Sequence, residues 1–127
     1  MERVLGELRQ GRKTGHWMWF VFPQIAGLGW SAMAQLYAIE TFNEAVGYVR
    51  HPVLGARLRE CTALVSAVEG KPAFEIFGTP DDLKFRSCMT LFAAADSEEP
   101  LFQAALTKYF GGVADEETMR LLNKRQG

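Results

Sequence analysis

Helix start and stop signals recur along the whole chain and constrain its fold more than any other feature of the sequence. Ser31, Thr41, Thr79, Ser97 and Asp115 each precede an apolar helical repeat, where their side chains can accept hydrogen bonds from unpaired backbone N–H groups. Glycines end several of these segments, and no stretch alternates apolar and polar residues as a half-buried strand would. The sequence therefore predicts an all-α fold, a compact bundle of about six to eight helices joined by short loops.

The clearest helical repeat runs from Leu54 to Val68, where apolar residues are spaced by three and four. It predicts a helix over 52–69. A second well-marked helix, over 80–95, begins with a proline and two acidic residues, which favour the first turn. The apolar segment 16–24 is too short for periodicity to separate strand from helix, and we favour a helix. The other helices are expected over 2–10, 32–39, 42–50, 72–77 and 98–110, with a last one after Asp115.

Composition predicts one domain that spans residues 1–127. The chain has 127 residues, of which 48% are hydrophobic, and no linker or repeat interrupts it. Its net charge of −1 provides no broad basic field for nucleic acid. The longest purely apolar run, 17–23, is far too short to span a membrane, and the N-terminus lacks the apolar core of a signal peptide. We therefore expect a cytoplasmic protein with no nucleic-acid or membrane partner.

The two cysteines, Cys61 and Cys88, lie within apolar helical repeats. Buried, reduced thiols of a cytosolic protein fit these positions better than a disulfide or redox pair. No cysteine or histidine has the spacing of a zinc site, and the common motifs for nucleophiles, phosphate loops and dinucleotides are absent from the sequence. We expect no metal and no cofactor.

Cations and aromatic residues are concentrated in residues 12–24. The candidate ligand contacts there are Arg12, Lys13, His16, Trp17, Trp19 and Gln24. In a pocket, cations beside flat rings could hold a phosphate and stack a base or sugar. Alternatively, the aromatic residues belong to the core and the cations compensate the C-terminal dipole of the first helix. For proton transfer His16 is the better candidate, because His51 precedes a proline and suits a turn or a cap.

Charges also cluster at the start of the helix expected over 80–95. Asp81 and Lys84 are three residues apart, and Asp82 and Arg86 are four apart, so each pair can form along the helix surface. In the functional alternative, one aspartate acts as a general base or orients a water, while the helix start and Lys84 or Arg86 hold an anion. The catalytic candidates are then Asp81, Asp82 and His16, and both charged segments have to meet in space.

Short motifs of distinctive composition run through nearly the whole chain. They are Gly11-Arg12-Lys13, His16 to Gln24, Gly27-Leu28-Gly29, Tyr37-Ala38-Ile39, His51 to Gly55, Ile76-Phe77-Gly78, Asp81 to Lys84, Met89 to Phe92, and Tyr109 to Gly112. Together they resemble the bacterial family catalogued as domain of unknown function 1810 (DUF1810). The resemblance implies a mainly α-helical single domain without an assigned activity.

The chain departs from this family in two respects. It lacks an N-terminal helical segment that members usually carry, which could expose apolar surface or remove a pocket wall, and it has Cys88 where a serine is common. The order of elements is also similar to that of N-glycosidases that act on ADP-ribosylated bases and on intermediates of riboflavin synthesis. The acid of those enzymes has no clear counterpart around Gln35 and Tyr37.

Two functional hypotheses remain open. The first is a ligand-binding or interaction domain, which takes a small anionic or nucleotide-like ligand or uses an exposed Trp30 to contact a partner or form a homodimer. The alternative is a hydrolase, similar to the N-glycosidases, for a phosphorylated ribosyl or ADP-ribose-type molecule. A shared ligand site would be favoured by a single pocket whose wall contains Trp17 and Trp19 together with Asp81 and Arg86.

Overall fold

A computed structural model of the chain describes residues 1–124, which form nine α-helices and no strand. The helices are α1 (Glu2–Arg9), α2 (Met18–Val21), α3 (Ala32–Tyr37), α4 (Phe42–Arg50), α5 (Leu54–Ser66), α6 (Ala73–Phe77), α7 (Asp81–Ala95), α8 (Pro100–Phe110) and α9 (Glu116–Lys124). Six of them have eight or more residues. The all-α prediction is confirmed.

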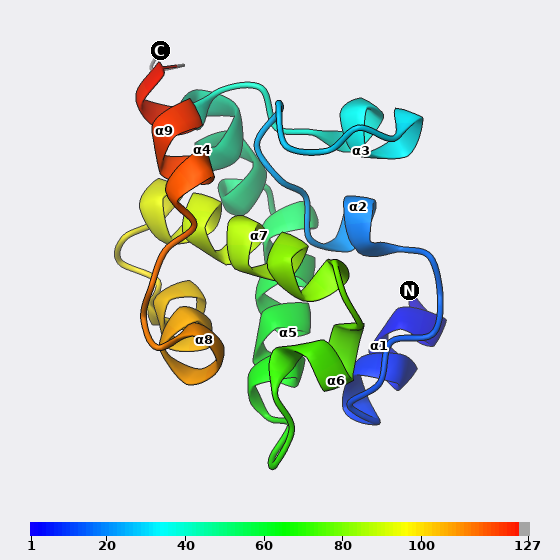
Figure 1. Ribbon diagram of the computed structural model, residues 1–127. Helices are drawn as coiled ribbons and strands as arrows, with labels where there is room; N and C mark the ends of the chain where they lie inside the picture. Colours follow the sequence, from blue (N-terminus) through cyan, green and yellow to red (C-terminus); the bar gives the residue numbers. More distant parts are fainter. Residues whose placement is uncertain (125–127) are drawn as a thin grey trace.

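Helix α7 is the centre of the fold. It packs against α2, α4, α6, α8 and α9, and it crosses α5 in the middle of Figure 1. Phe85 and all of residues 87–92 are buried, so this part of the helix is covered on every side. Phe85 of α7 meets the ring of Phe22 edge-on at 5.0 Å between centroids and stacks on Phe77 at 4.8 Å. These aromatic contacts form the interior around which the shorter helices are placed.

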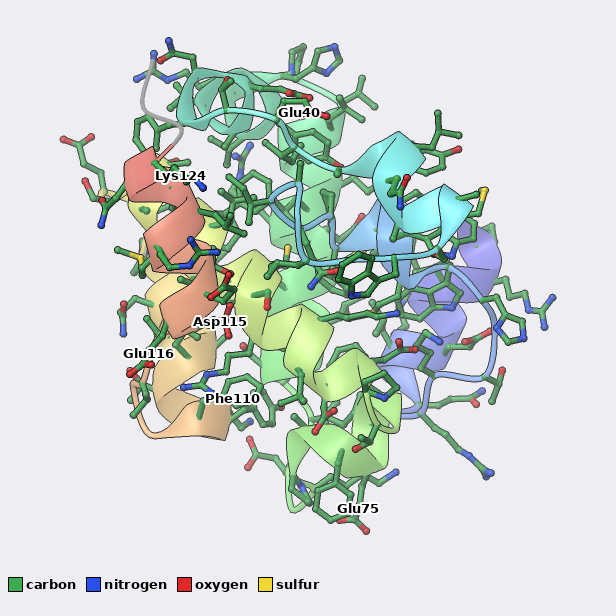
Figure 2. The ribbon with its side chains drawn as sticks, turned by 45° about the horizontal axis from the view of Figure 1, so that its top comes forward. Glu40, Glu75, Phe110, Asp115, Glu116 and Lys124 are labelled. Carbon is green, nitrogen blue, oxygen red and sulfur yellow. The ribbon has the colours of Figure 1, made fainter. Side chains whose placement is uncertain are left out.

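Three of the predicted caps are formed. The Thr41 hydroxyl accepts a hydrogen bond from the backbone N–H of Glu44 at 3.0 Å. Ser31 and Asp115 accept in the same way from the N–H group three residues further on. Figure 2 shows Asp115 at the start of α9. Each side chain satisfies a backbone donor that the first helical turn leaves unpaired, and α3, α4 and α9 begin directly after them.

Two predicted caps are wrong. Helix α7 begins after Pro80 without a side-chain cap, so Thr79 does not have this role. Helix α8 begins at Pro100 rather than after Ser97, and the Glu99 carboxylate accepts from the N–H of Leu101. A proline at the first helical position fixes the start of α8, because its backbone angle is already helical and its missing N–H needs no partner.

Helix α5 is shorter than the predicted 52–69. At its start, Nδ1 of His51 accepts hydrogen bonds from two backbone N–H groups, those of Val53 and Leu54, each at 3.1 Å. At its end, Lys108 and Tyr109 of α8 donate to backbone carbonyls of residues 65–68. Side chains of α8 therefore donate hydrogen bonds to backbone carbonyls that would accept from backbone N–H groups if α5 continued. The expectation that His51 is a capping residue is confirmed.

Residues 26–38, which we call the arm, project from the body of the molecule and carry α3 (Figure 1). Two backbone hydrogen bonds close its base, from Ala26 to Ile39 at 2.8 Å and from Ile39 to Gln24 at 2.9 Å. Ile39 is drawn into this isolated bridge, so α3 stops at Tyr37 instead of continuing to residue 39. No residue of α3 is buried. Beyond its base, the arm contacts the body of the molecule through α2 and through Leu28, which packs against the core.

Candidate ligand pocket

The two charged segments predicted from the sequence do meet. The ammonium group of Lys13 lies 2.8 Å from the Asp81 carboxylate, and that of Lys84 lies 3.4 Å from its other oxygen. The Lys13 side chain is only 8% exposed. Asp81 thus forms the expected pair with Lys84 and a second, largely buried pair with Lys13. This contact joins the N-terminal part of the chain to the start of α7.

Trp17 belongs to the core. It is 4% exposed, and its indole N–H donates to the Glu7 carboxylate at 2.9 Å. The same carboxylate oxygen accepts from the backbone N–H groups of Thr14 and Gly15, at 2.7 and 2.9 Å. Burial raises the pKa of Glu7, but these hydrogen bonds outweigh it and lower the pKa to about 2. For Trp17 the structure therefore agrees with the core interpretation.

Arg86 stabilises the connection between α8 and α9. Its guanidinium donates to the carbonyls of Val113 and Ala114, at 2.9 and 3.1 Å, and lies over the ring of Phe110. The predicted surface pair between Asp82 and Arg86 is therefore wrong, because backbone carbonyls of another segment occupy the guanidinium. Asp82 is half-buried, and its Oδ1 atom has no hydrogen-bond partner within residues 1–124.

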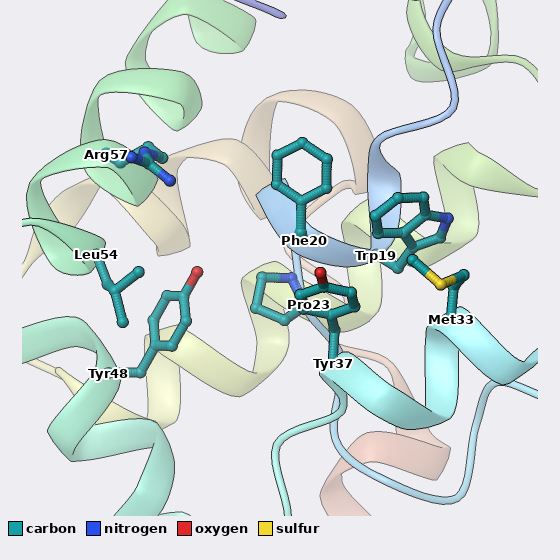
Figure 3. A pocket seen from close by; sticks show the side chains of 8 residues that line it. All are labelled: Trp19, Phe20, Pro23, Met33, Tyr37, Tyr48, Leu54 and Arg57. Carbon is teal, nitrogen blue, oxygen red and sulfur yellow. The ribbon is translucent and has the colours of Figure 1, made fainter. Parts of the chain in front are cut away.

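A hollow of ligand size lies elsewhere, between the arm, α2, α4 and the start of α5. This aromatic pocket has a volume of about 680 Å³, within the range of roughly 300–1,000 Å³ that is usual for small-molecule sites. Figure 3 shows the side chains around it. They are Trp19, Phe20, Pro23, Met33, Tyr37, Tyr48, Leu54 and Arg57. Four segments supply them, so the pocket exists only in the folded chain.

Stacked and tilted rings form one side of the aromatic pocket. The rings of Trp19 and Tyr37 stack at 5.4 Å with an angle of 24° between their planes, and Phe20 lies 5.1 Å from Trp19. On the opposite side Tyr48 is supported from behind by the buried Phe92, at 5.4 Å. A flat molecule could therefore contact ring faces from both sides.

Only one predicted site residue, Trp19, lies on this wall. Gln24 and Lys84 line a separate groove of about 390 Å³ on the other side of the arm. Arg12 and His16 are exposed, and neither aspartate predicted as catalytic lines the aromatic pocket. The pocket that would combine Trp17 and Trp19 with Asp81 and Arg86 is thus not formed by the described residues.

Sequence reasoning missed Tyr48 and Arg57 because each lies in a helix whose other features explained it. Tyr48 is in the middle of a capped amphipathic helix. Arg57 stands three residues after Leu54 and one before the buried Leu58, so it borders the apolar face of α5. The only indication in the sequence was the position of Arg57, a charged residue at the edge of the apolar face of its helix. Tyr37 was named only in the family motifs and in the comparison with the N-glycosidases, not as a ligand contact.

Within residues 1–124 no helix is long and apolar enough to cross a bilayer. The same residues contain no group of three or more histidine, cysteine or acidic side chains that could hold a metal ion. Cys61 and Cys88 are buried and not joined to each other, as expected. Burial raises the pKa of the Cys61 thiol to about 11 and that of Cys88 well above its ordinary value, so neither is an activated nucleophile.

Comparison with known proteins identifies relatives without an assigned activity. The model of a family described as protein of unknown function (DUF1810) matches residues 1–122. A conserved hypothetical protein from Mycobacterium tuberculosis, known from its crystal structure, has the same fold with a TM-score of 0.94. The two sequences are 54% identical, over 96% of this chain and 87% of that chain. No curated protein matches the chain.

Proposed function

Because the chain belongs to the DUF1810 family, whose function is unknown, we propose a role from its own surface: it binds a small, flat, largely apolar molecule in the aromatic pocket. The observation that carries this proposal is the set of stacked rings, Trp19 and Tyr37 with Phe20, left partly open to solvent beside a hollow of about 680 Å³. The three rings would make more apolar contacts if they were buried in the core. Their place beside an open hollow leaves apolar surface that a ligand could cover.

The energetics of the wall support this role. Burial of apolar surface contributes about 25 cal/mol per Å², and an aromatic pair adds about 0.5–1.5 kcal/mol beyond the burial of its area. A flat ligand would cover Tyr37 and Met33, which are 42% and 38% exposed. Hydrolysis is not part of the proposal, because the predicted catalytic residues Asp81, Asp82 and His16 lie outside the pocket wall.

A thermal-shift panel of bicyclic aromatic compounds, such as indole, quinoline and naphthalene derivatives, tests the proposal. A ligand at a hundred times its dissociation constant stabilises the folded state by about 2.7 kcal/mol, which is readily visible as a rise in Tm. We expect Trp19→Ala and Tyr37→Ala to abolish the rise. Trp30→Ala is the matched control, since Trp30 is 89% exposed and lines the separate groove.

The control separates the pocket from other aromatic surfaces. An unchanged rise in Trp30→Ala together with its loss in Trp19→Ala supports the proposal. A panel that leaves the Tm of the wild type unchanged would contradict it, as would ligands that shift all three variants equally.

A further inference from the structure

Arg57 stands apart from the other partly buried cations. All the other half-buried lysines and arginines of residues 1–124 bind a carboxylate or a backbone carbonyl of the protein. They are Lys13, Arg59, Lys71, Lys84 and Arg86. The guanidinium of Arg57 makes no hydrogen bond or ion pair with any residue of that range, although the side chain lies on the wall of the aromatic pocket.

The hydroxyl of Tyr48 is a second unpartnered polar group on the same wall. It has no hydrogen bond within residues 1–124, and Figure 3 shows it extending from the side of Arg57 and Leu54 toward the middle of the pocket. Burial raises the pKa of Tyr48 to about 12, against the opposing effect of Arg57, so the phenol is neutral and keeps a proton to donate. No acidic residue of the described part of the chain lines the pocket.

These observations refine the proposed function and depend on it. We infer that the ligand is an aryl carboxylate, with its ring against Trp19 and Tyr37 and its carboxylate on the guanidinium of Arg57 and the hydroxyl of Tyr48. An arginine fork matches the two oxygens of a carboxylate, and a phenol can donate a further hydrogen bond to one of them.

The charge of the wall favours a carboxylate over a phosphate. A phosphate monoester carries about −1.5 to −2 charges at neutral pH and is usually bound by several cations or by backbone N–H groups. Among residues 1–124, Arg57 is the only cation that lines the aromatic pocket. One guanidinium neutralises one carboxylate.

Binding of compounds on the same ring system tests the inference. We would measure dissociation constants by calorimetry for 2-naphthoate, 2-naphthamide and 2-naphthyl phosphate, and for indole-3-acetate and indole-3-acetamide. Charged hydrogen bonds of this kind correspond to roughly 10- to 100-fold in affinity, so each acid should bind at least about tenfold more tightly than its amide. The naphthyl phosphate should bind more weakly than naphthoate.

Three variants locate the effect. Arg57→Met keeps the apolar stem but removes the charge, and should bring acid and amide to within about twofold of each other without weakening the amide. Tyr48→Phe should weaken the acids by roughly 3- to 10-fold and leave the amides unchanged. Arg50→Met, which replaces an exposed arginine of α4 outside the pocket, is the control and should bind like the wild type.

The outcomes separate the two proposals. Amides that bind as tightly as their acids would overturn the carboxylate assignment while the pocket assignment stands, and so would a phosphate that binds more tightly than naphthoate. If Arg57→Met retains the full preference for the acids, the assignment to Arg57 is wrong. If no compound of either series binds and the thermal-shift panel also gives no response, both proposals fail together.

Discussion

At the scale of single residues, Glu7 organises the N-terminal part of the chain. One carboxylate oxygen accepts hydrogen bonds from two backbone N–H groups of the loop after α1 and from the indole of Trp17. Arg3 pairs with the other oxygen at 3.2 Å. The Glu7 side chain is 10% exposed, and its carboxylate takes the place of water for these three donors, of which the Gly15 N–H and the Trp17 indole are buried. A single acidic side chain thereby places Trp17 in the core.

We predict that Glu7→Gln lowers the free energy of unfolding by about 1–2 kcal/mol at pH 7, because an amide oxygen is a weaker acceptor and carries no charge. The folded-state pKa of Glu7 is about 2, below the ordinary value of 4.5. Its stabilisation is therefore complete above pH 4.5 and is lost as the pH falls toward 2. Urea unfolding at pH 7 and pH 3 should show the variant approaching the wild type in acid.

Glu2→Gln is the matched control for Glu7→Gln, since Glu2 lies exposed on the same helix. Its effect should stay within about 0.5 kcal/mol at both pH values. A constant deficit of Glu7→Gln between pH 7 and pH 3 would show that the charge of Glu7 is not what stabilises the loop.

Trp17 and Trp19 show how far sequence reasoning reaches at this scale. Both were predicted as ligand contacts on the same grounds, yet only Trp19 faces a pocket. The two residues flank the start of a four-residue helix, and which of them turns inward depends on Glu7, ten positions away. Local spacing does not contain that information.

At the scale of helices, Gly55 determines how closely α4 and α5 approach. A Cβ atom at this position would lie 2.0 Å from the carbonyl oxygen of Val49. That same oxygen accepts a hydrogen bond from Arg59 at 3.0 Å. Only glycine allows the last turn of α4 to contact the start of α5 in this way. The two helices supply Tyr48, Leu54 and Arg57 to the aromatic pocket.

We predict that Gly55→Ala destabilises the protein by about 1–3 kcal/mol, because backbone atoms must move apart to admit the methyl group. Gly47→Ala is the control. An added Cβ there meets nothing within 4 Å, and alanine in a helix is favoured over glycine by about 0.5–1 kcal/mol. Thermal unfolding should therefore show opposite shifts in Tm. A Gly55→Ala variant as stable as the wild type would contradict the close approach.

The helices themselves were largely predictable, and their ends were less so. Caps at Ser31, Thr41 and Asp115 follow from local chemistry, because the donor and acceptor lie three residues apart. The end of α5 depends on Lys108 and Tyr109, about forty residues further along the chain. Such tertiary donors compete with helix propagation in a way that periodicity cannot indicate.

At the scale of the whole molecule, the pair of Lys13 and Asp81 connects two distant parts of the chain. We predict a coupling energy of about 1–3 kcal/mol for a double-mutant cycle with Lys13→Met and Asp81→Asn, because Lys13 is largely buried and loses its main partner. The exposed pair of Glu117 and Arg120 in α9 is the control and should give a clearly smaller coupling, because solvent screens it. Equal coupling in both cycles would contradict a special role of the buried pair.

The aromatic pocket could not be assembled from the sequence, because its residues come from four segments between positions 19 and 57. The aromatic residues of segment 12–24 predicted Trp19 as a ligand contact, and Trp19 does line this hollow. The partner segment was sought near residues 81–87, where charges cluster. That segment contacts Lys13 instead, since ion pairing satisfies Asp81 within the protein.

The arm is fastened at residues 24–26 and 39 and contributes Met33 and Tyr37 to the pocket without contributing any buried residue of α3 to the core. Helix α3 can therefore vary in sequence at less expense to the core than α4, α5 or α7, whereas Leu28 of the arm packs against the core and has to be kept. We expect redesign of residues 32–37 to make the pocket accept a wider or narrower ring. A library confined to this stretch would explore new ligands on an unchanged scaffold.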